Sequence, residues 1–412
     1  MTGKMKRQIY FDHHATTPVD PLVLEAMVPF FTDHFGNASS TNHAYGWTAQ
    51  AAVEKARKQV ANCIGSEPSE IIFTSGATES NNFVFYGLSQ AYPDRKHLIV
   101  SEIEHEAVLD CVAHFESERG FEVTRLKVNS DGCIDLDALE AAIRPDTLVV
   151  SVMWANNEIG TIQKTKEIGE ICRKSDVFFH TDAVQAIGKV AVDVNQANVD
   201  LLSLSGHKIY GPKGVGALFV RRKNPRVGLR PFLFGGGQEK RMRPGTLNVP
   251  GIVGLGQAAE LAQTNRVLES KKLKKFREQI WTSLKKGFPS LELNGSKTAR
   301  LSGNLNMTFP GVQNQTLMQA LKNVAFSAGS ACATDKGMGS HVLRAIGLTP
   351  NQMNSTIRVG LGRFNTQEEV NYFIDRVLTE LGTQVKVKEM GLFQDPELRK
   401  AWRIKEDAYS DS

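Results

Sequence analysis

The chain has 412 residues, of which 41% are hydrophobic and 23% are charged, and its formal net charge is +5. This length exceeds one ordinary core, so we expect two domains, and the composition is typical of a globular protein. The small charge gives no indication of a nucleic-acid or anionic-membrane partner, and no apolar stretch approaches the length of a membrane span. Residues 1–10 carry several cations without a following apolar core, which argues against a secretory signal.

In chain order, apolar runs alternate with helical patterns between about residues 70 and 220. Strands are expected at 71–74, 97–101, 147–153, 177–180, 200–204 and 216–221, with helices starting near Glu79 and Glu104. This alternation predicts an α/β fold with a mostly parallel sheet covered on both faces.

A long helical pattern over about 252–286 leads into a smaller α+β unit. Its expected strands are 291–294, 304–309 and 356–360, and its helices 315–322 and 366–381. We therefore expect a large domain at 16–258, a small domain made of 1–15 and 259–390, and a C-terminal tail at 391–412.

The five cysteines are scattered, odd in number and contain no C-x-x-C pair. This pattern argues against a disulfide framework and a zinc site, and it favours a reducing compartment. Cys63, Cys111, Cys133 and Cys172 lie among apolar or helical residues and are expected in the core. Cys332 lies among small residues and glycines, which predicts a loop, with a new helix after Ser340.

Two strand ends carry the most informative residues of the chain. Asp182 ends one predicted strand, and Lys208 follows the next one 26 residues later. A lysine that can form a Schiff base and an acid that can pair a pyridinium nitrogen are what pyridoxal phosphate chemistry requires of a protein. Parallel strands open onto a ligand crevice at their carboxyl ends. Solvated turn residues are the alternative interpretation, so the pair alone leaves the function open.

A turn over residues 74–80 lies between a strand and a helix, where small residues and a helix N-terminus suit a phosphate. Such turns are also rich in small residues for packing alone. Neither a Walker loop nor a dinucleotide glycine motif occurs, which favours a monophosphate cofactor. Ser205 and His207 are suited to phosphate oxygens beside Lys208, and Gly206 would permit an unusual backbone path.

Four further residues have both a chemical and a structural interpretation. His105 suits ring stacking or proton transfer, or it is an exposed helix cap. Asn157 suits a ring substituent, or it shapes a turn. The Cys332 thiol suits attack on a substrate atom, or it is incidental. Arg358 suits an amino-acid carboxylate, or it is an ordinary strand-edge arginine.

These motifs closely resemble those of the cysteine desulfurases, the NifS/IscS-like branch of class V, fold-type-I pyridoxal phosphate (PLP) enzymes. The resemblance covers nearly the whole chain, and its motifs lie in family order at 10–20, 35–37, 74–80, 104–105, 156–160, 181–185, 205–214, 235–239, 243–246, 329–332 and 358–364. Ala38 and Pro244 depart from the common family residues without removing a chemical group. The tail does not reproduce the end that IscS-type enzymes offer to their scaffold protein.

The resemblance implies a large, mostly parallel, seven-stranded-type sheet domain and a role for each matching residue. Lys208 would be the Schiff-base lysine, Asp182 the pyridinium partner, and His105 the ring-stacking residue that assists proton transfer. The remaining implied roles are ring ligands for Asn157 and Gln185, a phosphate cradle for Ala77, Thr78, Ser205 and His207, the neighbouring subunit's phosphate for Thr246, and substrate-carboxylate binding for Asn37 and Arg358.

The implied activity converts L-cysteine to L-alanine and leaves a persulfide on Cys332. The implied protein is a cytoplasmic homodimer that passes sulfur to an acceptor such as an iron–sulfur scaffold, with other thio-cofactors and tRNA thiolation as further destinations. The alternatives are another class V enzyme, such as an aminotransferase or a selenocysteine lyase, and a PLP-binding protein without turnover. A Rossmann-like nucleotide binder is disfavoured by the missing glycine motif.

Overall fold

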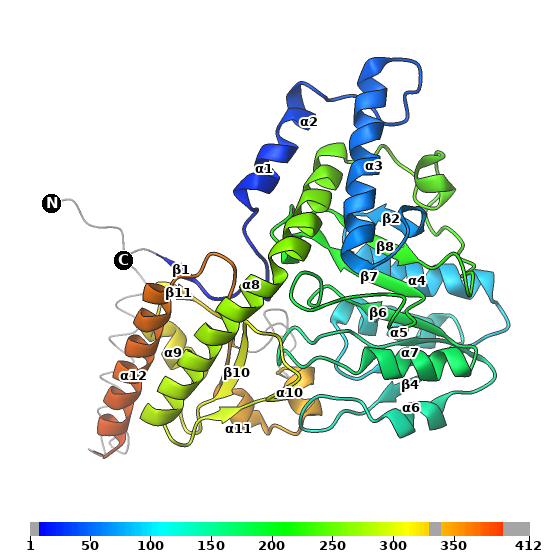
Figure 1. The fold of residues 1–412 in the computed structure, drawn as a ribbon. Coiled ribbons are helices and arrows are strands. Elements are labelled where there is room, and N and C mark those ends of the chain that lie inside the picture. Colours follow the sequence, from blue (N-terminus) through cyan, green and yellow to red (C-terminus); the bar gives the residue numbers. More distant parts are fainter. Residues whose placement is uncertain (1–7, 329–338, 390–412) are drawn as a thin grey trace.

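A seven-stranded sheet forms the centre of the larger part of the molecule (Figure 1). The computed structural model describes residues 8–328 and 339–389. In the order β2-β8-β7-β6-β5-β3-β4, only β8 runs antiparallel to its neighbours, so the predicted mostly parallel sheet is confirmed. The strands are β2 (Ile71–Thr74), β3 (His97–Ser101), β4 (Glu122–Leu126), β5 (Thr147–Ser151), β6 (Phe178–Asp182), β7 (Leu201–Ser205) and β8 (Gly216–Val220).

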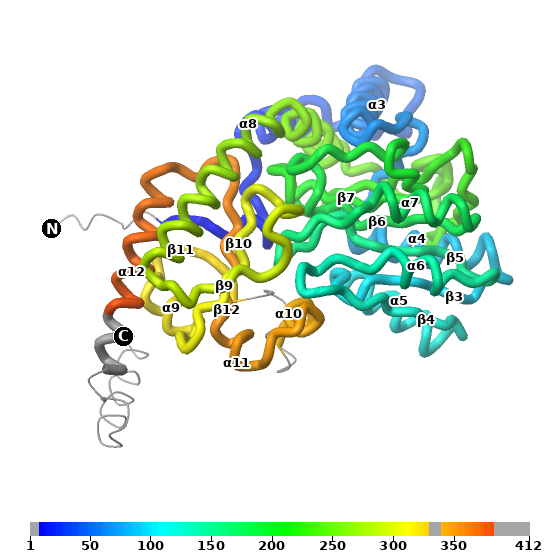
Figure 2. The backbone as a smooth tube through the Cα atoms, turned by 60° about the horizontal axis from the view of Figure 1, so that its bottom comes forward, coloured from blue at the N-terminus to red at the C-terminus, as the bar shows by residue number. Residues whose placement is uncertain are grey.

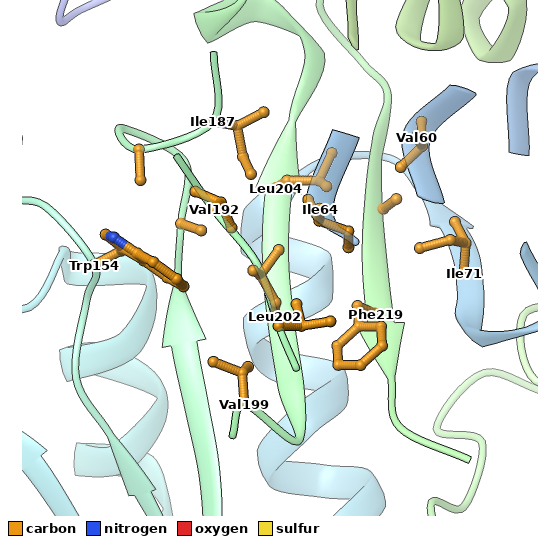
Figure 3. Close-up of a cluster of buried hydrophobic side chains, with 14 of the residues drawn as sticks. Val60, Ile64, Ile71, Trp154, Ile187, Val192, Val199, Leu202, Leu204 and Phe219 are labelled. Atoms are coloured by element: carbon orange, nitrogen blue, oxygen red, sulfur yellow. The ribbon is translucent and has the colours of Figure 1, made fainter. Parts of the chain in front are cut away.

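Helices cover both faces of this sheet, because its central strands are apolar on both sides. Leu202 and Leu204 of β7 pack with Val60 and Ile64 of α3 on one face, as Figure 3 shows. Leu201 belongs to the core cluster on the other face, beneath α4 and α5. The helices of this part are α1 (Pro21–Met27), α2 (Pro29–Thr32), α3 (Ala44–Ile64), α4 (Ala77–Ala91), α5 (Glu106–Glu118), α6 (Leu136–Ala142) and α7 (Thr165–Lys174).

A smaller antiparallel sheet, in the order β12-β10-β9, has its own core. That core includes Ile9 and Phe11 from the N-terminal segment, which enters through the parallel pair β1–β11. The elements are β1 (Ile9–Tyr10), β9 (Glu292–Leu293), β10 (Asn304–Thr308), β11 (Val324–Ala325), β12 (Thr356–Gly360), α9 (Asn314–Ala320), α10 (His341–Ala345), α11 (Pro350–Met353) and α12 (Gln367–Glu389).

Helix α8 (Val249–Gly287) runs through both parts of the molecule, and Figure 2 shows it passing from the larger sheet to the part that holds α12 and β9–β12. Its first half packs in the large core and its second half in the small one. The predicted boundary between residues 258 and 259 lies inside this helix. The division into 16–258, 1–15 plus 259–390, and 391–412 stays a prediction, which the separate cores support.

Some local predictions differ from the structure. Helix α4 begins at Ala77, two residues earlier than predicted, and α5 begins at Glu106, two residues later, because His105 is its N-cap. Cys111 and Cys172 are buried and Cys63 packs against the core, whereas Cys133 lies half-buried in a loop, so the core assignment was wrong for Cys133. Among the described residues, no helix has both the length and the apolar character needed to cross a bilayer.

Candidate active site

The segments that follow β2, β3, β5, β6 and β7 line one cavity of about 540 Å³. Because β2 and β7 both run antiparallel to β8, the carboxyl ends of all five strands meet at the same edge of the sheet. The N-terminal segment adds residues 14–16, and the small sheet's part adds His341 and Arg358. This volume is typical of a site for a small ligand or cofactor.

Lys208 lies in the short turn Gly206–Lys208 that follows β7, and its side chain lines the cavity. Its Nζ donates to the backbone carbonyl of His14 at 2.7 Å and to that of Ala15 at 2.6 Å. The predicted unusual backbone path at Gly206 is wrong, since its φ is not positive. Glycine is needed there for space, because a Cβ would lie 2.9 Å from the carbonyl oxygen of Pro212.

Asp182 ends β6 as predicted and is buried beside the cavity. Its Oδ2 accepts a hydrogen bond from Asn81 Nδ2 at 2.9 Å, and its Oδ1 accepts one from the Val184 N–H at 3.0 Å. These two donors fix the direction of the carboxyl group at the cavity wall. The arrangement suits pairing with a cationic nitrogen in the cavity.

The first turn of α4 places Ala77 and Thr78 at the cavity, opposite Ser205 and His207. A 15-residue helix presents backbone N–H groups and a positive potential at its N-terminus, which suits a phosphate. Burial, followed by the charge of Lys208, lowers the pKa of His207 to about 4, so its ring is neutral near pH 7. Its Nδ1 lies 3.1 Å from Thr16 Oγ1.

Glu79 also lines this end of the cavity, where a carboxylate would repel an anion. Arg243 neutralises it through bonds of 2.8 and 3.1 Å to the two carboxylate oxygens. Burial alone would raise the pKa of Glu79, but the bonds from Arg243 and Ser75 outweigh it and the pKa is lowered. Because the ion pair neutralises the Glu79 carboxylate, this residue no longer strongly repels a phosphate at the start of α4.

His105 confirms its interpretation as an exposed helix cap and also lines the cavity, where its chemical role stays a prediction. It is the exposed N-cap of α5, where its Nδ1 accepts a hydrogen bond from the Ala107 N–H at 3.1 Å, and it lines the cavity. Because Nδ1 is the acceptor in this bond, the neutral ring carries its proton on Nε2. That nitrogen is the one available for proton transfer.

Arg358 is buried and belongs to the cavity wall, unlike an ordinary strand-edge arginine. Its Nη2 donates to Asp12 Oδ1 at 2.8 Å and to Ser327 Oγ at 3.2 Å, while Nη1 donates to the Asn157 carbonyl at 3.2 Å. Its Nε is buried and has no partner among the described residues. A guanidinium that is held on one side and has an unsatisfied nitrogen suits recognition of a carboxylate.

Gln185 and Asn157, the predicted ring ligands, also line the cavity. The structure thus brings together all the predicted site residues that it describes except Asn37 and Thr246. Both lie on exposed segments and do not belong to the cavity wall of their own chain within the described ranges. Cys332 lies outside the described residues.

Several cavity residues were missed by the sequence analysis. His14 is buried at the wall, and its Nε2 finds no partner in the described part of the chain. Glu158 and His341 also line the cavity, on segments distant from His14 in sequence. His14 lies within the 10–20 motif, but nothing local to that motif indicates that it packs beside Lys208.

The comparisons with known proteins agree with this geometry. A family model described as "Aminotransferase class-V" matches residues 9–373. This match defines a PLP-dependent protein of fold type I.

A human protein named "Cysteine desulfurase" is 50% identical over 377 residues, which are 91% of this chain and 82% of that protein. "Cysteine desulfurase IscS" of Anaeromyxobacter sp. (strain K) is 53% identical over 371 residues, covering 90% of this chain and 91% of the relative. A solved structure titled "NIFS-LIKE PROTEIN" matches with a TM-score of 0.84 and 37% identity, covering 91% of this chain and 100% of the other. The chain belongs to the class V aminotransferase family, in its cysteine desulfurase branch of IscS and NifS type.

The residues of the cavity fit the cofactor of this family, pyridoxal 5′-phosphate. They comprise an aspartate at one strand end, a lysine after the next, and a helix N-terminus with hydroxyl and imidazole groups for a phosphate. The buried, unpartnered His14 Nε2 and Arg358 Nε, as seen in the described residues, provide two further polar atoms for a ligand.

Proposed function

We propose that Lys208, Asp182 and His105 are the working residues of a PLP-dependent cysteine desulfurase, and that Cys332 receives the sulfur. The observation that carries this proposal is the convergence of Lys208, Asp182 and the N-terminus of α4 on one cavity. When bound, the cofactor supplies an electron sink that stabilises negative charge on the substrate α-carbon.

The chain's residues divide the binding of the cofactor among them. Lys208 Nζ tethers its carbonyl carbon, and the carboxylate of Asp182 pairs with the ring nitrogen. Asn157 and Gln185 act at the ring substituents. The phosphate is bound by backbone N–H groups of Ala77 and Thr78 and by the side chains of Thr78, Ser205 and His207.

Proton transfer is assigned to two groups on the cavity wall. The Lys208 amine, when it is not engaged in holding the cofactor, would remove the α-proton of L-cysteine. His105 exchanges a proton through Nε2, since its Nδ1 is engaged by the Ala107 N–H. Both groups come from strand ends that the sheet fixes, so their relative position does not depend on the substrate.

Arg358 binds the carboxylate of L-cysteine through its guanidinium, and Asn37 has the predicted role of binding the same carboxylate.

The Cys332 thiolate forms a bond to the sulfur of L-cysteine as the bond between that sulfur and Cβ breaks. The electron pair of the broken bond stays on the β-carbon, which takes up a proton. The α-carbon regains a proton in place of the one that Lys208 removed, and the product leaves as L-alanine. Cys332 retains the sulfur as a persulfide, which an iron–sulfur scaffold or another acceptor then takes up.

A homodimer is proposed from an apolar surface on α1, α2 and the start of α3. Large apolar side chains there are between 50% and 67% exposed, which is more than isolated surface residues explain. They are Leu22, Leu24, Val28, Phe31, Phe35, Tyr45 and Trp47. Asn37 lies between two members of this surface in the sequence. Thr246 is likewise exposed, as its proposed role at a neighbouring subunit requires.

The dimer is tested by the mass of the protein in solution. A double variant, Leu24→Glu with Phe31→Glu, is expected to be monomeric by light scattering, while the wild type has the mass of two chains. Val267→Glu on α8 changes an equally exposed apolar residue outside this surface and should leave the mass unchanged. A double variant that stays dimeric would refute the assigned surface.

A cytoplasmic compartment is proposed because the four cysteines that the structure describes are free. Capture of the persulfide-loaded enzyme from the native cytosol, followed by identification of labelled acceptors, would test both the compartment and the scaffold. The proposal requires the label to reach a protein that assembles iron–sulfur clusters.

The decisive test of function is alanine production from L-cysteine in the presence of a thiol reductant. Cys332→Ser is expected to abolish sulfide release and alanine formation while the absorbance of the bound cofactor is retained. Cys133→Ser is the matched control, since this cysteine is half-buried in a loop away from the cavity wall. Normal turnover by Cys332→Ser would refute the persulfide role and would favour a class V enzyme of another kind.

A further inference from the structure

A second lysine, Lys189, lies close behind Lys208. It follows β6 in the turn that also carries Gln185, and its Nζ donates to Gln185 Oε1 at 2.7 Å. Lys189 lines a small cavity of about 40 Å³, whose wall includes Lys208 and His14. Lys208 and His14 also line the large cavity, whereas Lys189 does not. Lys189 therefore lies outside the wall of the large cavity, on the far side of Lys208 and His14.

The hydrogen bonds of Gln185 define the direction of its carboxamide. Its Oε1 accepts from Lys189 Nζ and faces His14 Nδ1 at 3.2 Å, which together occupy both lone pairs of a carbonyl oxygen. Its Nε2 donates to the His14 carbonyl at 2.9 Å and keeps one further hydrogen. A flipped amide would set its oxygen against the His14 carbonyl, acceptor against acceptor, and its NH₂ group against Lys189 Nζ, donor against donor while Lys189 is charged. The observed orientation therefore leaves an N–H of Gln185 for a ligand in the large cavity.

We propose that Lys189 is a positioning residue of the desulfurase reaction, which holds Gln185 as a hydrogen-bond donor toward the cofactor ring and adds positive charge behind Lys208. This inference rests on the proposed tether at Lys208. The same His14 carbonyl accepts from both Lys208 Nζ and Gln185 Nε2, so a single backbone atom links the two side chains that Lys189 influences.

Among the described residues, the charged and titratable groups that face Lys189 are Lys208, His13, His14 and His207, with Tyr210, Glu269 and Arg363 also in the wall of the small cavity. Burial lowers the pKa of His13 to about 4 and that of His14 well below its ordinary value, so both rings are neutral near pH 7. Glu269 is bound to Arg363 at 2.6 Å. Burial and then the charge of Lys208 lower the pKa of Lys189 to about 7, so the positive charge of Lys189 is present mainly below that pH.

A donor at a ring oxygen and a positive charge near the tethering nitrogen both favour the unprotonated form of that nitrogen. Loss of Lys189 should therefore raise the pH midpoint at which the visible absorbance of the bound cofactor changes. A nearby charge typically shifts such a midpoint by about one pH unit or more. If Lys189 had only a structural role, its replacement would change the stability of the protein but not this pH midpoint.

The test compares pH titrations of cofactor absorbance in purified holoenzymes. Lys189→Met removes the donor and the charge, Lys189→Gln keeps a donor and removes the charge, and Lys189→Arg keeps both. We expect the midpoint to rise by about one unit in Lys189→Met, by less in Lys189→Gln, and to stay near the wild-type value in Lys189→Arg. Lys174→Met, at an exposed lysine paired with Glu140, is the control and should titrate like the wild type.

If Lys189→Met and Lys189→Gln both show the wild-type midpoint in the pH titration of cofactor absorbance, the inference is refuted. If Lys189→Met does not fold, as judged by its thermal midpoint, Lys189→Gln supplies the same comparison. A wild-type protein without cofactor absorbance would instead refute the proposed tether at Lys208. The two failures are therefore distinguishable.

Discussion

Asn81 in α4 and Asp182 at the end of β6 are joined by a buried hydrogen bond of 2.9 Å between Nδ2 and Oδ2. Asn81 Oδ1 has no partner among the described residues, where the bond to Asp182 is the hydrogen bond that holds this carboxamide. The helix whose first turn is assigned to the phosphate thus also orients the carboxylate assigned to the ring nitrogen. One element fixes both ends of the proposed cofactor.

Replacing Asn81 with alanine should weaken cofactor binding. A hydrogen bond to a charged group contributes about 1.5–3 kcal/mol, so the dissociation constant for PLP is expected to rise about ten-fold or more. Titration of the apoprotein with PLP, followed by absorbance, measures it. Asn62→Ala, at an exposed position of α3, is the control. Equal affinities in the two variants would show that Asn81 does not support Asp182.

Replacing Arg358 with lysine should raise the KM for L-cysteine about ten-fold or more, because an ammonium cannot reproduce the fork that Asp12 and the Asn157 carbonyl now hold. The cofactor absorbance should remain. Arg300→Lys changes another buried arginine of the small part, one that bonds Asn304 and does not line the large cavity. A KM effect as large in Arg300→Lys would remove Arg358 from substrate recognition.

Ser340 anchors the chain just after the segment that carries Cys332. Its hydroxyl donates to buried Glu158 Oε2 at 2.6 Å and, as the N-cap of α10, accepts from the Leu343 N–H at 3.1 Å. Ser340→Ala should lower the free energy of unfolding by about 2–4 kcal/mol, since it removes a cap and leaves a buried acid unpaired. Urea unfolding measures this. Thr349→Ala removes the more exposed cap of α11 and should cost about 1 kcal/mol.

Glu104 should make stability depend on pH. Burial raises the pKa of this carboxyl group from 4.5 to about 8. Between those values the folded protein keeps a proton that the unfolded chain loses, so this contribution to stability falls as pH rises from about 4.5 to 8. Glu104→Gln removes the titration. The variant should gain stability relative to the wild type by up to about 1.4 kcal/mol for each pH unit in that window.

Urea unfolding of the wild type and Glu104→Gln at several pH values measures the difference in their free energies of unfolding. The contributions of the buried histidines cancel in this difference because both proteins contain them. Glu116→Gln, at an exposed acid paired with Arg125, should show a difference that changes little with pH. A constant difference between Glu104→Gln and the wild type across the window would mean that Glu104 is already ionised in the folded protein.

Helices and strands that depend on the local pattern of apolar and polar residues could be predicted from the sequence. Strand β12 was predicted with its observed bounds, and α10 begins after Ser340 as the sequence indicated. Strand β4 was not predicted, because its residues are mostly polar and it lies at the sheet edge, where only one neighbour supports it. Cys133 was misplaced because cysteine is usually buried, and the single apolar neighbour Ile134 does not show that Cys133 lies in a loop.

The site residues at strand ends could be predicted from the sequence. The residues that position them could not. Asp182, Lys208 and His105 each follow a recognisable apolar strand, so parallel pairing alone brings them to one edge. Asn81, His14 and Lys189 act through contacts between segments that are far apart in sequence or through side-chain direction within a turn. No local pattern encodes such contacts, and they required the folded chain.

The central claim is that PLP is tethered at Lys208. Borohydride reduction of the purified holoenzyme, followed by proteolysis and mass spectrometry, tests it most directly. The account predicts a single pyridoxyl adduct on the peptide that contains Lys208, and none on those that contain Lys189 or Lys213, which lie in or behind the same site. An adduct on either of these other lysines, or none at all on a protein supplied with PLP, would contradict it.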